Sequence, residues 1–414
     1  MITIQDFRNL QNFPIERKRV KTEHDSVVGS IIDAVRSEGD AALLRYANRL
    51  DNLGDLPLQV SEDELASAER ALCTELRNAV DTAIHNIREF AEAQLPRERF
   101  SEFSPGRKLG WIVRPLDAVG CYIPSGRYPL VSTLLMTAVL AQAAGVSRVC
   151  IASPKPSTEI LGCAHLLGIK EVYRVGGAQA IAAMAFGTPT IARVDRIVGP
   201  GNAYVATAKK LLAGEVGIDF VAGPTEIMIL AASGDASVIA ADMLAQAEHD
   251  TEASAVFVTC SENLAKAVGE ELENQLRTLP TRDIAGPSIS KNGRIYLVPD
   301  MNVAVLLANL WAPEHLSLHD PSLLPQIKNA GTVLLGHSSP ESAADYAAGP
   351  SHVLPTLGGA RLRGGLSATD FVKLIAIQQL SSSALEELAP VIKTLARAEG
   401  LEAHARAVEV RSVQ

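Results

Sequence analysis

The sequence predicts an α/β protein whose parallel sheets belong to at least two domains. A chain of 414 residues is too long for one ordinary hydrophobic core. The composition is 47% hydrophobic but only 4% aromatic, as suits aliphatic strands that helices bury on both faces. Short apolar runs also alternate with helical patterns twice along the chain, and this alternation is the unit of a parallel sheet.

The amino-terminal quarter is expected to be mainly helical. Helices are predicted over 25–50 and 61–97, and the second begins with Ser61 as a cap and three acids in its first turn. A strand is expected at 110–115. The sequence therefore predicts a helical N-terminal segment ahead of the α/β part of the chain.

Two α/β runs follow, and the Gly/Pro-rich stretch 199–224 is the expected junction between them. The elements of the first run are the strand 148–153, a helix through Leu167, the strand 171–175 and an alanine-rich helix after Gly176 and Gly177. Those of the second run are the strand 226–230, the helix 236–249, the strand 255–259, the helix 261–276 and the strands 294–298 and 332–335. The last fifty residues look helical and carry few strand signals, so an arm or tail is expected there.

Charge and composition exclude several classes of function. The formal net charge is −9, and lysine and arginine form no basic stripe, so nucleic acid is not an expected partner. Apolar runs are too short for a membrane span and the N-terminus has no signal pattern, so a cytoplasmic protein is expected. Five cysteines without a CxxC pair read as free, mostly buried thiols, with no motif for a catalytic cysteine.

Gln246 and His249 are three residues apart on an expected helix, so both could point at one ion. Spacing alone favours a structural role, because glutamine is an uncommon metal ligand and a lone histidine usually packs. Asp345 lies in a Gly/Pro-rich loop after the strand 332–335. Its carboxylate would suit zinc at the carboxyl end of a parallel strand, or it would cap a short helix.

Glu314 and His315 follow a proline break, where adjacent side chains can converge. A carboxylate beside an imidazole is the usual pairing for proton transfer near neutral pH, although a solvated loop pair fits equally well. Near the end of the chain, a glycine break could turn Glu399 and His404 inward. Taken alone, His404 reads as a surface residue.

The loops 199–202 and 223–226 flank the expected domain junction. Their glycines would let the backbone approach a ligand, and Asn or Thr could bind a hydroxyl; ordinary turn chemistry is the alternative. No GxGxxG motif follows any strand, so a dinucleotide would be bound without the usual glycine turn.

Taken together, these segments resemble histidinol dehydrogenase over nearly the whole chain. The matching strings, in the family's order, are 120–124, 176–182, 199–202, 223–226, 246–249, 312–316, 345–346, 352–356 and 401–404. The resemblance implies a homodimer with two incomplete Rossmann-like domains with parallel sheets, a helical N-terminal segment and a C-terminal arm that reaches the partner subunit. The implied boundaries are 1–121 with 225–367 for the first domain, 122–224 for the second and 368–414 for the arm.

The resemblance also implies Zn²⁺, one per subunit, NAD, and the four-electron oxidation of L-histidinol to L-histidine. The implied zinc ligands are Gln246, His249, Asp345 and, across the dimer, His404, and the implied acid–base residues are Glu314 and His315. The implied substrate contacts are Thr225, Gln246, His249, His315, Asp345, Glu399 and His404. Along NAD, the implied contacts are Tyr122, Gln179 and Asn202. His315 would remove the hydroxyl proton as hydride leaves. Glu314 would then activate water toward the bound aldehyde.

Three positions depart from the family's usual pattern. Ser125-Gly126-Arg127 replaces a Gly-Gly pair, Thr225 replaces a serine, and Ala231-Ala232 replaces an acidic residue. The altered loop keeps open a paralogue that oxidises another small polar alcohol, such as a sulfonated diol, because an added cation favours an anionic substrate. A catalytically dead relative is a third possibility, against which the retained titratable residues argue.

Overall fold

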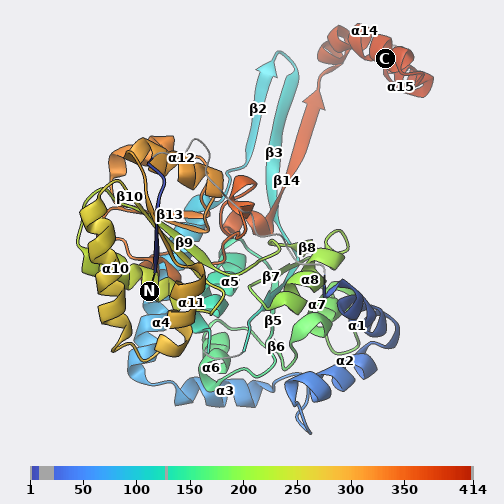
Figure 1. The fold of residues 1–414 in the computed structure, drawn as a ribbon. Helices are drawn as coiled ribbons and strands as arrows, with labels where there is room; N and C mark the ends of the chain where they lie inside the picture. Colours follow the sequence, from blue (N-terminus) through green and yellow to red (C-terminus); the bar gives the residue numbers. More distant parts are fainter. Residues whose placement is uncertain (1, 9–22, 126–128, 412–414) are drawn as a thin grey trace.

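The computed structural model describes residues 2–8, 23–125 and 129–411, and it confirms the α/β class with two parallel sheets (Figure 1). Within these residues, the six-stranded sheet has the order β1-β11-β10-β9-β12-β13 and the five-stranded sheet the order β6-β5-β4-β7-β8. The strands of the first are β1 (Thr3–Asp6), β9 (Glu226–Leu230), β10 (Ser254–Thr259), β11 (Arg294–Leu297), β12 (His315–Leu318) and β13 (Thr332–Leu335). Those of the second are β4 (Ala118–Tyr122), β5 (Arg148–Ala152), β6 (Glu171–Tyr173), β7 (Arg196–Val198) and β8 (Gly217–Ile218).

Both faces of the six-stranded sheet are covered by helices. Ile227 and Ile229 of β9 pack with α9 (Ala236–Ala247) and α10 (Glu262–Leu276). The alternate residues Met228 and Leu230 pack on the opposite face, with α12 (Met301–Trp311). Because successive strand residues face opposite sides, a sheet covered twice needs continuous aliphatic runs. This requirement explains why the strands were recognisable in the sequence.

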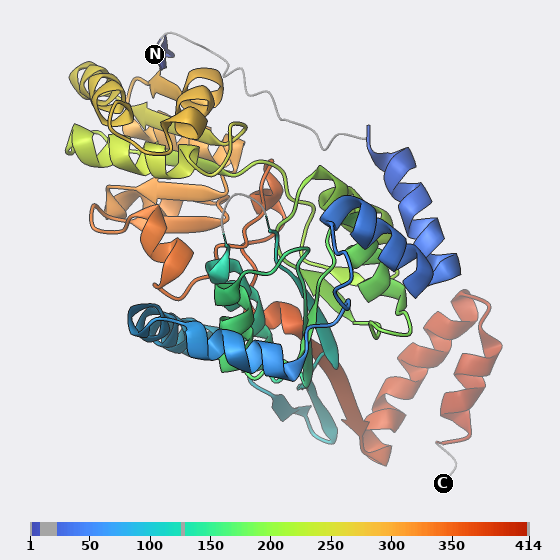
Figure 2. The same cartoon turned by 90° about the horizontal axis from the view of Figure 1, so that it is seen from below.

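The N-terminal helices pack on the five-stranded sheet (Figures 1 and 2). One face is covered by α1 (Asp25–Glu38), α2 (Asp40–Tyr46), α7 (Gly177–Phe186) and α8 (Ala203–Leu212), and the other by α3 (Glu62–Ala71), α4 (Thr74–Gln94), α5 (Val131–Ala143) and α6 (Thr158–Leu166). Residues 1–121 are expected in the first domain. Of these residues, β1 joins the six-stranded sheet, whereas the helices α1 to α4 pack on the five-stranded sheet. Helical periodicity identifies a buried face but not the sheet that the face will cover.

Both long N-terminal helices are interrupted. Gly39, with φ of 57°, divides the helix expected over 25–50, which ends in the π-helix η1 (Ala47–Asp51). Leu72 and Cys73, whose backbone is extended, divide the helix expected over 61–97 into α3 and α4. Ser61 caps α3 as predicted. The other helices of the body in the described residues are α11 (Arg282–Asn292), α13 (Glu341–Tyr346) and the 3-10 helices η2 (Pro321–Gln326), η3 (Gly359–Arg361) and η4 (Ala368–Phe371). Within the described ranges, no helix has both the length and the hydropathy of a membrane span.

The prediction that the last fifty residues carry few strand signals is wrong. β14 (Val372–Leu380) pairs antiparallel with β3 (Arg107–Pro115), which pairs antiparallel with β2 (Arg99–Ser104). Leu374 and Ile375 of β14 are 55% and 46% exposed. The strand therefore lacks the alternating burial that reveals a strand in a sequence, and its pairing with β3 defines it instead.

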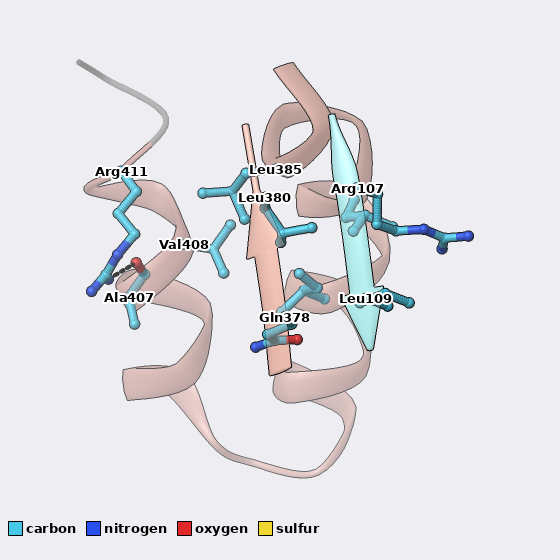
Figure 3. A pocket seen from close by; sticks show the side chains of 10 residues that line it. Arg107, Leu109, Gln378, Leu380, Leu385, Ala407, Val408 and Arg411 are labelled. Atoms are coloured by element: carbon cyan, nitrogen blue, oxygen red, sulfur yellow. Dashed lines mark hydrogen bonds between the residues drawn. The ribbon is translucent and has the colours of Figure 1, made fainter. Parts of the chain in front are cut away.

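This three-stranded sheet projects from the body and carries α14 (Ser382–Ala398) and α15 (Glu402–Glu409) at its outer end (Figures 1 and 2). We refer to β14, α14 and α15 as the arm. A groove of about 460 Å³ separates the strands from the two helices, and Leu109, Leu380, Leu385 and Val408 are among its lining residues (Figure 3). The arm therefore keeps apolar surface uncovered in the single chain.

Candidate active site

Several expected site residues meet at the amino ends of β9 and β12, which are adjacent parallel strands. Thr225 precedes β9, and Glu314 precedes β12, which begins with His315. Asp345 of α13 lies at the same edge, with its Oδ1 3.7 Å from His315 Nε2. The expectation that Asp345 lies at the carboxyl end of a parallel strand is therefore wrong, because α13 brings the chain back to the opposite edge of the sheet.

Local backbone structure fixes the position of Glu314. Ala312 ends α12 in the left-handed conformation, with φ of 57°, and Pro313 prevents the helix from continuing. The carbonyl of Glu314 then accepts the N–H of Thr332 at 3.0 Å, at the start of β13. A tight exit from a helix thus holds the carboxylate at the sheet edge.

Glu314, Thr225 and Gln246 form a buried hydrogen-bond chain. Glu314 Oε2 accepts the Thr225 hydroxyl at 2.6 Å and the N–H of Glu226 at 2.7 Å. The side-chain amide of Gln246 donates to Thr225 Oγ1 at 2.9 Å. Gln246 is fully buried, and its Oε1 has no hydrogen-bond partner among the described residues. The amide oxygen is therefore left available to a ligand.

His315 lies among carboxylates and is only 3% exposed. Its Nδ1 is 3.4 Å from Glu341 Oε1 and 3.8 Å from Glu314 Oε2, while Asp345 lies near Nε2. Burial alone would lower the pKa of His315, but Glu341, Asp345 and Glu314 outweigh it and raise that pKa to about 10. Burial also raises the pKa of Glu314, against the opposing effect of His315. The two side chains are therefore coupled acid–base groups.

The described residues contain one cluster of acids and histidines close enough to share a metal ion: His249, Glu341 and Asp345, whose ligand atoms lie within 4.8 Å of one another. His249 Nε2 is 3.7 Å from Asp345 Oδ2. Burial opposes ionisation of Asp345, yet His249 and His315 hold the pKa of its carboxyl well below the ordinary value. Nitrogen and oxygen donors of this kind suit Zn²⁺, so the residues present fit a divalent cation.

Glu341 is the buried site residue that the sequence analysis missed. It is 2% exposed, and neither of its carboxylate oxygens has a hydrogen-bond partner within the described ranges. Burial raises its pKa, although His315 opposes this effect. An acid in the first turn of a short helix normally reads as a solvated capping residue, so nothing in the local sequence marked it. A buried carboxylate without a donor is stabilised by a bound cation.

The structure does not bring Glu399 and His404 to this edge. Both lie on the outer part of the arm and are exposed. Figures 1 and 2 show the arm directed away from the six-stranded sheet. In the single chain the candidate site therefore contains Gln246, His249 and Asp345 without His404.

Tyr122, Gln179 and Asn202 lie at the carboxyl edge of the five-stranded sheet. Tyr122 ends β4, Gln179 lies in the first turn of α7 after β6, and Asn202 caps α8 after β7. The strand order reverses between β4 and β7, and ligands of open α/β sheets bind at such a switch point. Gly126 and Arg127 of the altered loop lie outside the described residues.

Contacts join this carboxyl edge to the amino edge of the six-stranded sheet. Oγ1 of Thr133, at the start of α5, lies 3.3 Å from His352 Nε2. Nδ1 of His352 lies 2.8 Å from the carbonyl oxygen of Asp345. The N–H of Gly223 donates to Thr356 Oγ1 at 2.6 Å. A ligand along the carboxyl edge could therefore extend toward His315.

The buried cysteines offer no activated nucleophile. All five are free, and Cys121, Cys150 and Cys163 are buried. Burial raises the pKa of Cys121 to about 12 and that of Cys163 to about 11, which disfavours the thiolate that a nucleophile requires.

Comparisons with known proteins extend over nearly the whole chain. Residues 15–412 match the histidinol dehydrogenase family. The chain is 43% identical over 412 residues to the histidinol dehydrogenase of Sulfurimonas denitrificans, covering 97% of this chain and 96% of that protein. It is 46% identical over 393 residues to that of Thermus thermophilus, covering 94% of each.

Solved structures agree with the sequence comparisons. The histidinol dehydrogenase of Elizabethkingia anophelis has a TM-score of 0.94 at 34% identity, covering 99% of this chain and 98% of that one. An acetylating aldehyde dehydrogenase from Geobacillus thermoglucosidasius, with a TM-score of 0.51 at 14% identity, covers 87% of this chain and 92% of that one and shares the fold alone. The chain is therefore an oxidoreductase that belongs to the histidinol dehydrogenase family.

Proposed function

We propose that this chain catalyses the zinc-dependent, NAD-linked oxidation of L-histidinol to L-histidine through bound L-histidinal, the last steps of histidine biosynthesis. The observation that carries the proposal is the convergence of Glu314 and His315 with metal-donor side chains at one sheet edge. Family membership supports the choice of substrate.

The metal would be held by Gln246, His249 and Asp345 of the body, with His404 supplied by a second copy of the chain. The unpaired Gln246 Oε1 and the approach of His249 to Asp345 support this assignment. When bound, zinc would supply a Lewis acid for binding the polar groups of the substrate.

His315 receives the hydroxyl proton while hydride passes from the carbinol carbon to NAD, which yields the aldehyde. The surrounding carboxylates hold this imidazole at the sheet edge and stabilise its charged form, which supports this role. His315 can accept this proton when the negative charge of the same carboxylates is offset, as a cation bound among them would do.

Glu314 then takes a proton from water as the water adds to the aldehyde. Its raised pKa suits a general base near neutral pH, and its hydrogen bonds to Thr225 and Glu226 fix its orientation. The hydrated aldehyde gives a second hydride to a second NAD and becomes the carboxylate. Four electrons leave in two steps.

NAD would lie along the carboxyl edge of the five-stranded sheet, near Tyr122, Gln179 and Asn202. The switch point between β4 and β7 supports this placement, since it offers a nucleotide crevice without a GxGxxG turn.

The active enzyme would be a homodimer with shared sites. The exposed position of Glu399 and His404 and the uncovered apolar surface of the arm support a second copy as its partner. Glu399 would then contact the substrate bound in the other subunit. The free cysteines suit the cytoplasm, where we expect the enzyme to act.

A steady-state assay with L-histidinol and NAD tests the proposal. Two NADH per histidinol, lost on chelation and restored by zinc, is the expected result. Zinc-replete protein that is inert toward histidinol but oxidises another small polar alcohol would instead identify a paralogue. Protein that binds no zinc and oxidises no alcohol would identify a catalytically dead relative.

A further inference from the structure

Asp51 reaches the carboxyl edge of the five-stranded sheet from outside that sheet. It ends η1, and its Oδ2 accepts the N–H of Gly176 at 3.0 Å and the side-chain amide of Gln179 at 3.2 Å. Asp51 is 9% exposed, and its Oδ1 accepts no hydrogen bond from the part of the chain that the structure describes. Among the described residues, this mostly buried carboxylate therefore keeps one oxygen without a hydrogen-bond donor at the turn after β6, and Lys155 is the cation whose charge acts on it.

Two proposed NAD contacts meet at the same turn. The Tyr122 hydroxyl accepts the N–H of Gly177 at 3.2 Å, so its own proton remains available to a ligand. Burial raises the pKa of Tyr122 to about 12, which keeps that proton in place. Gln179 is fully buried, and its Oε1 has no partner among the described residues. An acceptor beside a donor suits a vicinal diol of a sugar.

The position of Asp51 along the sheet edge indicates which end of the dinucleotide would lie near it. The contacts that lead to His315 leave the sheet through Thr133, after β4, and through Gly223, after β8. The turn of Asp51 follows β6, which lies two strands from β4, or roughly 10 Å. With the nicotinamide near His315, the adenosine end extends toward β6.

We infer that Asp51 determines specificity for NAD over NADP by accepting a hydrogen bond from the 2′-hydroxyl of the adenosine ribose. This inference rests on the proposed function. A carboxylate at this position accepts a hydrogen bond from the diol and repels a 2′-phosphate. Asp51 acts here at a ligand contact, in addition to tying η1 to the sheet.

Asp51→Asn separates these two roles. The asparagine amide oxygen can still accept the N–H of Gly176, while the charge and the free acceptor are removed. Binding of NAD and of NADP is measured by calorimetry on the purified full chain without substrate. The variant is expected to bind NAD about tenfold more weakly and to raise the ratio of NADP to NAD affinity about tenfold or more.

Asp195→Asn is the control, because Asp195 Oδ2 accepts the N–H groups of Asp117 and Ala118 at the opposite edge of the same sheet. It should leave the affinity ratio unchanged. If circular dichroism shows that the Asp51→Asn variant is unfolded, Asp51→Ser is used in its place. An unchanged ratio in a folded Asp51 variant, or wild-type protein that binds NADP as tightly as NAD, overturns the inference. Wild-type protein that binds neither dinucleotide overturns the proposed function itself.

Discussion

Burial determines the chemistry of the carboxylates around His315. Glu314 is 5% exposed, yet two hydrogen bonds satisfy one of its oxygens. Glu341 is 2% exposed, and both of its oxygens lack donors in the described part of the chain. The two acids therefore have different roles available: Glu314 is oriented for proton transfer, and Glu341 adds negative charge that a cation can neutralise.

Glu314→Gln should slow oxidation of the aldehyde more than oxidation of the alcohol. Only the aldehyde step needs a base that activates water, and loss of such a base costs about 10²- to 10⁴-fold in rate. Single-turnover rates measured separately with L-histidinol and L-histidinal test this. Equal losses on both steps would contradict the role given to Glu314.

Glu341→Gln should stabilise the metal-free protein and weaken its response to zinc. The substitution removes a buried like charge beside Asp345 and Glu314, and it also removes electrostatic attraction for the cation. Thermal midpoints are measured with a chelator and with added zinc. A lower midpoint in chelator would show that Glu341 stabilises the fold instead, and an undiminished rise with zinc would show that Glu341 does not attract the cation.

At the scale of elements, the two sheets present opposite edges to the site: the amino edge of the six-stranded sheet and the carboxyl edge of the five-stranded one. α9 carries Gln246 to the first edge and His249 follows its end, while α13 supplies Glu341 and Asp345. The donors of the proposed metal site therefore depend on helix placement as well as on strand ends.

Ser61→Ala should lower the free energy of unfolding by about 1 kcal/mol, since the Ser61 hydroxyl accepts the N–H of Glu64 at 3.2 Å and caps α3. Ser67→Ala is the matched control, because it removes the same hydroxyl from an exposed position inside that helix. Denaturant titration compares the two variants. Equal stability of both would refute the capping role.

Asp242 of α9 gives the fold a pH dependence. Burial raises its pKa from 3.8 to about 6, so the unfolded chain loses the proton first and stability falls as pH rises between these values. Asp242→Asn should therefore stabilise the protein by about 3 kcal/mol at pH 8 and progressively less toward pH 4. Exposed Asp283→Asn is the control for denaturant titrations at both pH values. A gain independent of pH would contradict this account.

The sequence predicted the strands that are buried on both faces. It missed the features that depend on contacts between distant parts of the chain. Strands such as β9 and β10 are buried at every position, and their aliphatic runs identified them. β14 has a mostly exposed pattern and depends on β3, more than 250 residues earlier in the chain. Glu341 begins α13, which packs against α9, a helix almost a hundred residues earlier in the chain. Neither contact leaves a local pattern in the sequence.

The proposed metal and acid–base residues of the body were indicated by the family's motifs rather than by spacing. Gln246 lies in the last turn of α9, but His249 lies beyond the end of that helix, so the prediction that the two residues share a helix face is wrong. Asp345 reaches His249 by a path that no local pattern indicates. The sequence analysis also missed that the site lies at the amino edge of the six-stranded sheet. The reason is that β12 is a four-residue strand that begins at His315 itself.

At the scale of the whole molecule, the arm is the feature that one chain leaves unexplained. It exposes Val391 and Leu395 of α14 by 58% and 59%, and it carries His404 away from His249 and Asp345. A second copy would cover the apolar surface and complete the metal site at once. Symmetric exchange of arms would then make two equivalent sites in a closed dimer.

Complementation between two inactive variants tests this shared site most directly. Co-expressed His404→Ala and His249→Ala chains form mixed dimers in which one site receives an intact body and an intact arm, so about a quarter of the wild-type activity should return. His249→Ala with Asp345→Ala is the control, because both bodies are then damaged and no site is whole. Recovery with the first pair alone is the predicted result. Full activity of His404→Ala by itself, or no more recovery than in the control pair, would contradict a metal site completed by the arm of a second chain.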